Sequence, residues 1–263
     1  MNDRLVAVIP ARLGSSRFPG KPLAPLLGRP MIEHVLRRAE MCPQLDAVYV
    51  ATCDDEIKHV VEGLGGLVIM TSASHERATD RVAEAAGQID AGIVMMIQGD
   101  EPMITTSMVA AAITPLLENT SVNCVNLIRR ITTREDYLDP NTIKVVMNER
   151  NEALYFSRAS IPALEFTEGI DAPVFKQVCV IPFRSEFLNE FARWPQTPLE
   201  RAESIDMLRI LEHGGRVCLV ETTEETHAVD TPEDLRRVET LMKHDLLIPL
   251  YSGRAEVICP GES

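Results

Sequence analysis

Residues 5–10 read LVAVIP, and residues 11–23 continue as ARLGSSRFPGKPL. Almost every position of the first run is apolar, which indicates a strand buried on both faces, as strands of a parallel sheet are. Three more apolar runs of strand length follow within the first hundred residues, at 47–52, 67–71 and 93–98. The chain is therefore expected to begin with a buried, mostly parallel sheet.

Amphipathic helices are predicted between these strands. Apolar residues recur at helical spacing in two segments, at Ile32, Val35, Leu36 and Ala39 and again at Ile57, Val60, Val61 and Leu64. Two glycines at 65 and 66 suit the end of the second helix. The alternation of strands and helices predicts an α/β fold with a doubly wound, mostly parallel sheet.

The middle of the chain is less regular. It holds three expected strands, at 122–128, 142–147 and 174–181, separated by loops rather than by regular helices. We interpret residues 122–195 as a smaller lobe inserted into, or extending, the main sheet of one domain of residues 1–243, with 244–263 as a tail. After the lobe we expect a helix at 199–213, a strand at 216–221 and a helix at 231–243, which Thr231 would cap.

Composition excludes several classes of protein. A formal net charge of −13 over 263 residues would repel nucleic acid at long range. No apolar run reaches the roughly 20 residues of a membrane span, and the first residues do not read as a leader, so we expect a cytoplasmic protein. The six scattered cysteines are expected to be free thiols. An anionic substrate must then meet a local cluster of positive charge.

The loop after the first strand offers such a cluster. Arg12, Arg17 and Lys21 lie within ten residues, together with Gly14 and Gly20. Cations and closely approaching backbone N–H groups suit a polyphosphate. The spacing is neither that of a Walker A loop nor G-x-G-x-x-G. The loop leaves the carboxyl edge of the sheet, where open α/β folds bind ligands.

Two carboxylates are expected at the same edge. Asp100 follows the strand at 93–98, beside Glu101, and Asp230 precedes the helix at 231–243. Magnesium prefers one or two carboxylates together with phosphate oxygens and water. Asp230 has the alternative role of helping to cap its helix. Together with the cationic loop, the pair predicts metal-assisted transfer of a phosphorus group.

Other polar residues give weaker signals. Lys144, Arg158 and Arg184 are candidates for an acceptor carboxylate, or are ordinary surface or ion-pair residues. His75 is expected to be structural. No Ser-His-Asp or Cys-His pattern is present in the sequence, so covalent catalysis is not predicted.

Six stretches together, at 9–23, 98–104, 141–146, 155–158, 198–200 and 230–235, resemble the 3-deoxy-manno-octulosonate (Kdo) cytidylyltransferases, from about residue 4 to 243. The resemblance implies a nucleotidyltransferase-type α/β fold, a homodimer with the smaller lobe as its dimerisation lobe, and a place in lipopolysaccharide biosynthesis. It also implies Mg²⁺-dependent attack by the anomeric hydroxyl of a sugar acid on the α-phosphate of CTP, with release of pyrophosphate. Such chemistry relies on positioning and charge neutralisation.

The resemblance also implies roles for residues. Arg12, Arg17 and Lys21 would hold the triphosphate, and Asp100 and Asp230 the magnesium, so that Arg17, Lys21 and the two aspartates form the catalytic group. The nucleotide would meet Ala11, Arg12, Gly14, Ser15, Ser16, Arg77, Thr79 and Gln98. The acceptor would meet Arg158, Gln177, Ile181 and Asp206.

The acceptor side differs from the family pattern. Gln177 and Ile181 stand where an imidazole and a phenol are usual, and Asp206-Met207 replaces a Glu-Gln pair. Arg77-Ala78-Thr79 replaces Ser-Gly-Thr, a change that leaves the base preference open. We favour a cytidylyltransferase for Kdo or a related 3-deoxy-2-keto acid. The alternatives are a CTP-dependent enzyme for a less hydroxylated acid, and a non-catalytic nucleotide-binding protein.

Overall fold

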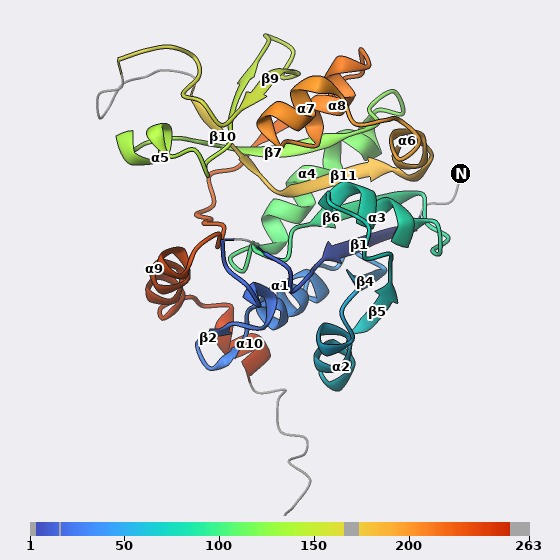
Figure 1. The fold of residues 1–263 in the computed structure, drawn as a ribbon, viewed down its shortest axis with the longest axis vertical. Coiled ribbons are helices and arrows are strands. Elements are labelled where there is room, and N and C mark those ends of the chain that lie inside the picture. Colours follow the sequence, from blue (N-terminus) through green and yellow to red (C-terminus); the bar gives the residue numbers. More distant parts are fainter. Residues whose placement is uncertain (1–3, 16, 166–173, 253–263) are drawn as a thin grey trace, which may run out of the picture.

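The computed structural model describes residues 4–15, 17–165 and 174–252. Its main sheet has five strands in the order β11-β6-β1-β4-β5 (Figure 1). Four are parallel and β11 runs antiparallel to β6 at one edge. Their bounds are β1 (Leu5–Pro10), β4 (Ala47–Thr52), β5 (Leu67–Met70), β6 (Ile93–Ile97) and β11 (Val180–Arg184). The predicted parallel-rich α/β sheet is confirmed.

Helices cover both faces of this sheet. One apolar cluster joins β1 and β6 to α1 (Met31–Glu40), α2 (Asp55–Gly63) and α4 (Thr106–Glu118). A second cluster joins the opposite face to α3 (Ala78–Ala86) and α6 (Ser185–Phe191). The two-sided cover explains why the strands are apolar at nearly every position.

The register of the sheet determines where the site forms. β1 lies between β4 and β6, with Val8 opposite Met96, so the segments that follow β1 and β6 emerge side by side. The first continues into the short 3-10 helix η1 (Lys21–Leu23) and the small hairpin of β2 (Pro25–Leu26) and β3 (Arg29–Pro30).

A second, mixed sheet packs above the main one in Figure 1, in the order β12-β7-β10-β8-β9. Its strands are β7 (Val125–Arg130), β8 (Lys144–Met147), β9 (Ala153–Ser157), β10 (Phe175–Val178) and β12 (Cys218–Glu221). β12 comes from beyond residue 195, and β11, from within the predicted lobe, belongs to the main sheet. The boundaries 122–195 therefore do not coincide with the second sheet.

The strand predicted at 174–181 is wrong as one element. The chain leaves the second sheet after Val178 and enters the main sheet at Val180. Cys179 makes the crossing, because its N–H donates to Glu101 Oε1 at 3.3 Å and its carbonyl accepts from Gln98 N at 3.1 Å. Between the first two strands expected in the middle of the chain, where a loop was predicted, the structure has the short helix α5 (Arg134–Leu138).

The helix predicted at 199–213 is broken in two. α7 (Pro198–Glu203) ends at Ser204, whose φ of 58° is left-handed, and α8 (Met207–Glu212) follows. The break lets Asp206 Oδ2 accept hydrogen bonds from the backbone N–H and the hydroxyl of Thr79. A tertiary contact has thus overridden a continuous helical pattern.

The C-terminal part folds back on the domain. Thr231 caps α9 (Pro232–Met242) as predicted, in a reciprocal capping box with Asp234. Residues up to Ser252 then form α10 (Ile248–Ser252), and the hydroxyl of the buried Tyr251 lies 2.8 Å from His34 Nδ1 of α1. Within the described ranges, no helix combines the length and apolarity needed to span a bilayer.

Candidate active site

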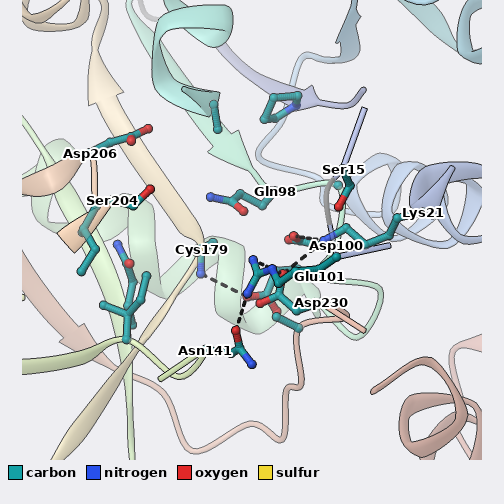
Figure 2. Close-up of a pocket in the computed structure, with 18 of the residues that line it drawn as sticks. Ser15, Lys21, Gln98, Asp100, Glu101, Asn141, Cys179, Ser204, Asp206 and Asp230 are labelled. Atoms are coloured by element: carbon teal, nitrogen blue, oxygen red, sulfur yellow. Dashed lines mark hydrogen bonds and ion pairs between the residues drawn. The ribbon is translucent and has the colours of Figure 1, made fainter. Parts of the chain in front are cut away.

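A cavity of about 490 Å³ opens where the carboxyl ends of β1 and β6 face the second sheet. Its wall combines the loop after β1, the segment after β6, the start of α3, strand β10 and the α7–α8 corner. Figure 2 shows side chains from these distant segments directed into one space. The predicted sheet-edge site is therefore a pocket closed by the second sheet.

The loop after β1 is held in a defined shape. Gly20 adopts φ 73°, its N–H donates to Leu13 O at 3.0 Å, and the Leu13 N–H donates to Asp54 Oδ2 at 2.8 Å. The left-handed turn is open to glycine without strain. It starts η1 at Lys21 and brings this side chain to the carboxylates.

Lys21, Asp100 and Asp230 converge in the cavity (Figure 2). Lys21 Nζ donates to Asp100 Oδ2 at 2.7 Å and to Asp230 Oδ1 at 3.4 Å. Arg17 adds a second cation, 2.9 Å from Asp230 Oδ1, and also donates to Asn141 Oδ1. Residues separated by up to 213 positions thus form one charged cluster.

The capping alternative for Asp230 is wrong. The cap of α9 is Thr231, and the Asp234 carboxylate accepts from the backbone N–H groups of Asp230 and Thr231. The Asp230 carboxylate is left to face Lys21 and Arg17.

Electrostatics in the cluster favour an additional cation. Burial, and next the charge of Asp100, raise the pKa of Asp230 above its ordinary value. Burial by itself would lower the pKa of Lys21, but the two carboxylates more than offset it and the pKa is raised. Two partly buried carboxylates that lie this close together repel each other, and a divalent ion would relieve the repulsion that remains beside Lys21 and Arg17.

The carboxylate oxygens of Asp100 and Asp230 suit magnesium better than they suit a metal ion whose ligands all come from the protein. Among the described residues, no group of three or more His, Cys, Asp or Glu side chains is arranged to hold a metal. Two oxygen donors that converge beside cations suit an ion that completes its shell with phosphate oxygens and water.

Glu101 is buried directly behind Asp100. Its Oε2 accepts from Thr226 Oγ1 at 2.8 Å and its Oε1 from the Cys179 N–H. Burial, with the nearby charge of Asp100, raises the pKa of Glu101 to about 7. Glu101 therefore links three segments of the chain: the one after β6, the crossing at Cys179 and the one that contains Thr226.

Several predicted nucleotide residues line the cavity: Ala11, Arg12, Ser15, Arg77 and Gln98. Arg12 is steadied by the carbonyl of His75, 3.4 Å from its Nη1. His75 also lines the cavity and pairs with Glu84. Gly14 and the buried Thr79 lie outside the lining, and Ser16 lies outside the described residues.

The Arg77 side chain is directed at the α7–α8 corner. Nη1 donates to the Ser204 hydroxyl, and Nη2 lies 3.5 Å from Glu200 O. Its Nε lies 3.9 Å from carboxylate oxygens of both Glu200 and Asp206. Arg77 thus connects the start of α3 to the acceptor side of the cavity.

The predicted acceptor residues Arg158, Gln177, Ile181 and Asp206 also line the cavity. Most of their polar atoms are already engaged. Gln177 Nε2 donates to Asn126 Oδ1 at 2.6 Å, and Arg158 donates to the carbonyls of Glu203 and Pro140 at 2.8 and 3.0 Å. Burial raises the pKa of Asp206.

Two further candidates for binding an acceptor carboxylate, Lys144 and Arg184, instead form hydrogen bonds within the fold. Lys144 Nζ donates to three carbonyl oxygens, those of Asp139, Thr142 and Arg158. Arg184 donates to carbonyls at the end of α4 and the turn after it. Neither lines the cavity.

Sequence reasoning missed Lys176 and Asn141, which line the cavity. Lys176 carried a usable signal, because a lysine in the mostly apolar run of residues 174–181 is unusual unless it meets a partner or a ligand. Asn141 follows a proline in a loop, and only its contact with Arg17 distinguishes it.

A nucleotide-transferring enzyme is the class that this fold and site define, and comparison with known families agrees. The profile of the family described as Cytidylyltransferase matches residues 6–226.

Curated relatives narrow the class. The 3-deoxy-manno-octulosonate cytidylyltransferase of Geobacter sulfurreducens is 45% identical over 249 residues, covering 91% of this chain and 99% of the relative. That of Solibacter usitatus is 40% identical and covers 96% and 100%. The chain belongs to the 3-deoxy-manno-octulosonate cytidylyltransferase family.

Solved structures agree. CMP:2-keto-3-deoxy-manno-octonic acid synthetase complexed with CTP superposes with a TM-score of 0.85 at 37% identity, over 93% of this chain and 100% of that one. A cytidylyltransferase from Leptospira borgpetersenii, at 16% identity and a TM-score of 0.64, covers 99% of this chain and 100% of its own. That second likeness shows the fold alone.

Proposed function

We propose that this protein transfers CMP from CTP to Kdo or a related 3-deoxy-2-keto sugar acid, with release of pyrophosphate. The observation that carries the proposal is the convergence of Lys21, Asp100 and Asp230 in a cavity that also presents Arg12 and Arg17. Family membership supplies the nucleotide and the acceptor class.

Asp100 and Asp230 would hold magnesium, which when bound draws negative charge from the phosphate oxygens. Arg12, Arg17 and Lys21 neutralise the triphosphate. The acceptor hydroxyl oxygen forms a bond to the α-phosphorus, the bond to pyrophosphate breaks, and the hydroxyl proton passes to solvent. These residues thus position the two substrates and neutralise the charge of the triphosphate. None of them forms a covalent intermediate.

A second candidate acceptor is a less hydroxylated acid. Met96, Ile181 and Met207 line the acceptor half of the cavity. An apolar side chain cannot hydrogen-bond a sugar hydroxyl, and a site lacking such partners discriminates weakly in favour of that hydroxyl.

The third hypothesis, a non-catalytic nucleotide-binding protein, gains little support. A binding module has no need of two converging carboxylates, which repel each other and the phosphates of a nucleotide.

Pyrophosphate release, measured with each of four nucleoside triphosphates and a panel of sugar acids, tests the three hypotheses. We expect release with CTP and Kdo in the presence of magnesium. Release with CTP and another acid, but not Kdo, would favour the second candidate. No release with any combination would favour the binding protein. A preference for another nucleotide would assign Arg77 a role in base choice.

Homodimer formation and a cytoplasmic location stay predictions. Light scattering after size-exclusion chromatography tests the first, and cell fractionation tests the second.

A further inference from the structure

The cations on the acceptor half of the cavity differ in how many partners they already have. Arg158 donates to the carbonyls of Pro140 and Glu203, and its Nη2 lies 3.5 Å from Ser204 O. Arg77 holds the same corner through the Ser204 hydroxyl. An acid that enters this half therefore meets two guanidinium groups that are engaged with the protein.

Lys176, on β10, is different. The residue is 8% exposed and lines the cavity. An ammonium group has three N–H donors. Within the described part of the chain, its Nζ makes one hydrogen bond, to Thr226 O at 3.3 Å. Its ion-pair partner Asp136 lies at 3.9 Å, beyond hydrogen-bond distance. A buried ammonium group thus retains donors toward the cavity.

The charges around Lys176 do not fully compensate its burial. Asp136 and Glu101 favour the charged form, whereas Arg129 and Arg237 oppose it, and His227 lies close by. Burial is the largest effect and lowers the pKa of Lys176. A further anion at this position would therefore be stabilised by the ammonium group.

The position of Lys176 relative to the reaction centre identifies the anion. Thr226 accepts from Lys176 through its carbonyl and donates through its hydroxyl to Glu101, the neighbour of Asp100. In the cyclic form of a 2-keto sugar acid, the carboxylate and the attacking hydroxyl are on the same carbon. The cation that binds the carboxylate must therefore lie near the metal-binding carboxylates, and Thr226 links Lys176 to Glu101, the residue next to Asp100.

We propose that Lys176 binds the carboxylate of the acceptor acid and so places its hydroxyl for attack. The proposal rests on the proposed function. It gives Lys176 a different role from Arg158 and Arg77, which hold the wall of the cavity that contains Asp206.

The test compares Kdo with its methyl ester, which has the same hydroxyls but no negative charge. Pyrophosphate release is measured with both acceptors for the wild type and for Lys176→Met. For the wild type, we expect kcat/KM to fall on the order of tenfold to a hundredfold on esterification, the effect of one charged hydrogen bond. In Lys176→Met, Kdo loses this advantage and the two acceptors react at similar rates, while KM for CTP is unchanged.

Control variants distinguish the loss of a contact with the acceptor from a loss of the fold. Lys176→Arg retains the preference for Kdo because it keeps the charge, and Lys243→Met, at an exposed position, behaves as wild type. If Lys176→Met does not fold, Lys176→Gln is compared by the same ratio. An unchanged ratio of Kdo to ester in the neutral variants would overturn the role of Lys176 and leave the proposed function intact. No turnover of Kdo or of any related 3-deoxy-2-keto acid by the wild type would overturn both.

Discussion

Lys21 lies between two carboxylates, Asp100 and Asp230, that come from distant parts of the chain. Its side chain is 13% exposed, and those of Asp100 and Asp230 are 18% and 19% exposed. At this degree of burial each charge depends on its neighbours, because water screens it poorly. The group accordingly behaves as one unit, and changing any member affects the other two.

Replacing either aspartate by asparagine tests the metal assignment. We expect Asp100→Asn and Asp230→Asn each to lower kcat by on the order of 10²- to 10³-fold, because a neutral amide is a poorer magnesium ligand and stabilises less charge. Steady-state pyrophosphate release measures the loss.

Asp55→Asn, at an exposed position in the first turn of α2, is the matched control and should retain wild-type turnover. Circular dichroism checks that all three variants are folded. Near-normal rates in both Asp100→Asn and Asp230→Asn would contradict the metal assignment.

At the scale of elements, the site depends on how closely the ends of β1 and β6 approach. A Cβ atom at Gly99 would lie 2.9 Å from Pro10 O and 3.3 Å from Ile32 Cδ1. Only a residue without a side chain lets the segment after β6 pass the end of β1 at this distance. The glycine next to Asp100 is therefore set by packing.

Gly99→Ala should lower the free energy of unfolding by about 1–3 kcal/mol, as overpacking against backbone does. Activity should fall as well, because Asp100 shifts with the strand end. Gly14→Ala is the control, since its added Cβ meets nothing within 4 Å. Equal urea midpoints for the two variants would show that the approach of β1 and β6 is not tight.

The C-terminal segment adds a second element-scale constraint. His34, fully buried on α1, lies 2.8 Å from both the Tyr251 hydroxyl and Leu26 O. Arg38 pairs with Asp245 at 2.5 Å. Residues 244–252 are thereby attached to α1, the helix that follows the loop after β1.

This attachment should depend on pH. Burial lowers the pKa of His34 below the ordinary 6.5, so the unfolded chain takes up the proton first as the pH falls. The stability contributed by neutral His34 is thus present above about 6.5 and lost below it. We expect His34→Gln, which cannot titrate, to gain stability relative to the wild type as the pH falls from about 7.5 to about 5.5.

Urea unfolding at a series of pH values measures that difference. A difference in unfolding free energy that does not change with pH would refute the role of His34. Tyr251→Phe serves as the companion variant, because it keeps the titrating imidazole and removes only the hydroxyl.

At the scale of the whole molecule, the two sheets are not separable pieces of chain. β7 pairs with β10 on one side and with β12 on the other, and β11, which directly follows the crossing at Cys179, belongs to the main sheet. The cavity lies between two sheets whose strands come from overlapping stretches of the chain. The two walls of the cavity are therefore held in a fixed position relative to each other.

We therefore expect a fragment of residues 122–195 not to fold alone, because it lacks β12 and leaves β11 without its neighbour β6. Circular dichroism and urea titration of the isolated fragment measure this. A cooperative unfolding transition would contradict the expectation and support an independent lobe.

The sequence by itself determined the four parallel strands of the main sheet, the cationic loop and the pair of aspartates. Strands buried on both faces are apolar throughout, and helix starts such as Thr231 have local signals, so both can be read from neighbouring residues. Local signals also suggested one strand across Cys179 and one helix across Ser204, and both were wrong because contacts with Glu101 and Thr79 decide there.

Only the tertiary structure decided which charges meet. Lys21 reaches carboxylates 79 and 209 residues away, and no local pattern records such a contact. Nor does any pattern show that Arg77, Arg158 and Lys144 are engaged with the protein while Lys176 keeps donors toward the cavity. The energy of a charged group depends on everything that surrounds it, and those surroundings exist only after the chain has folded.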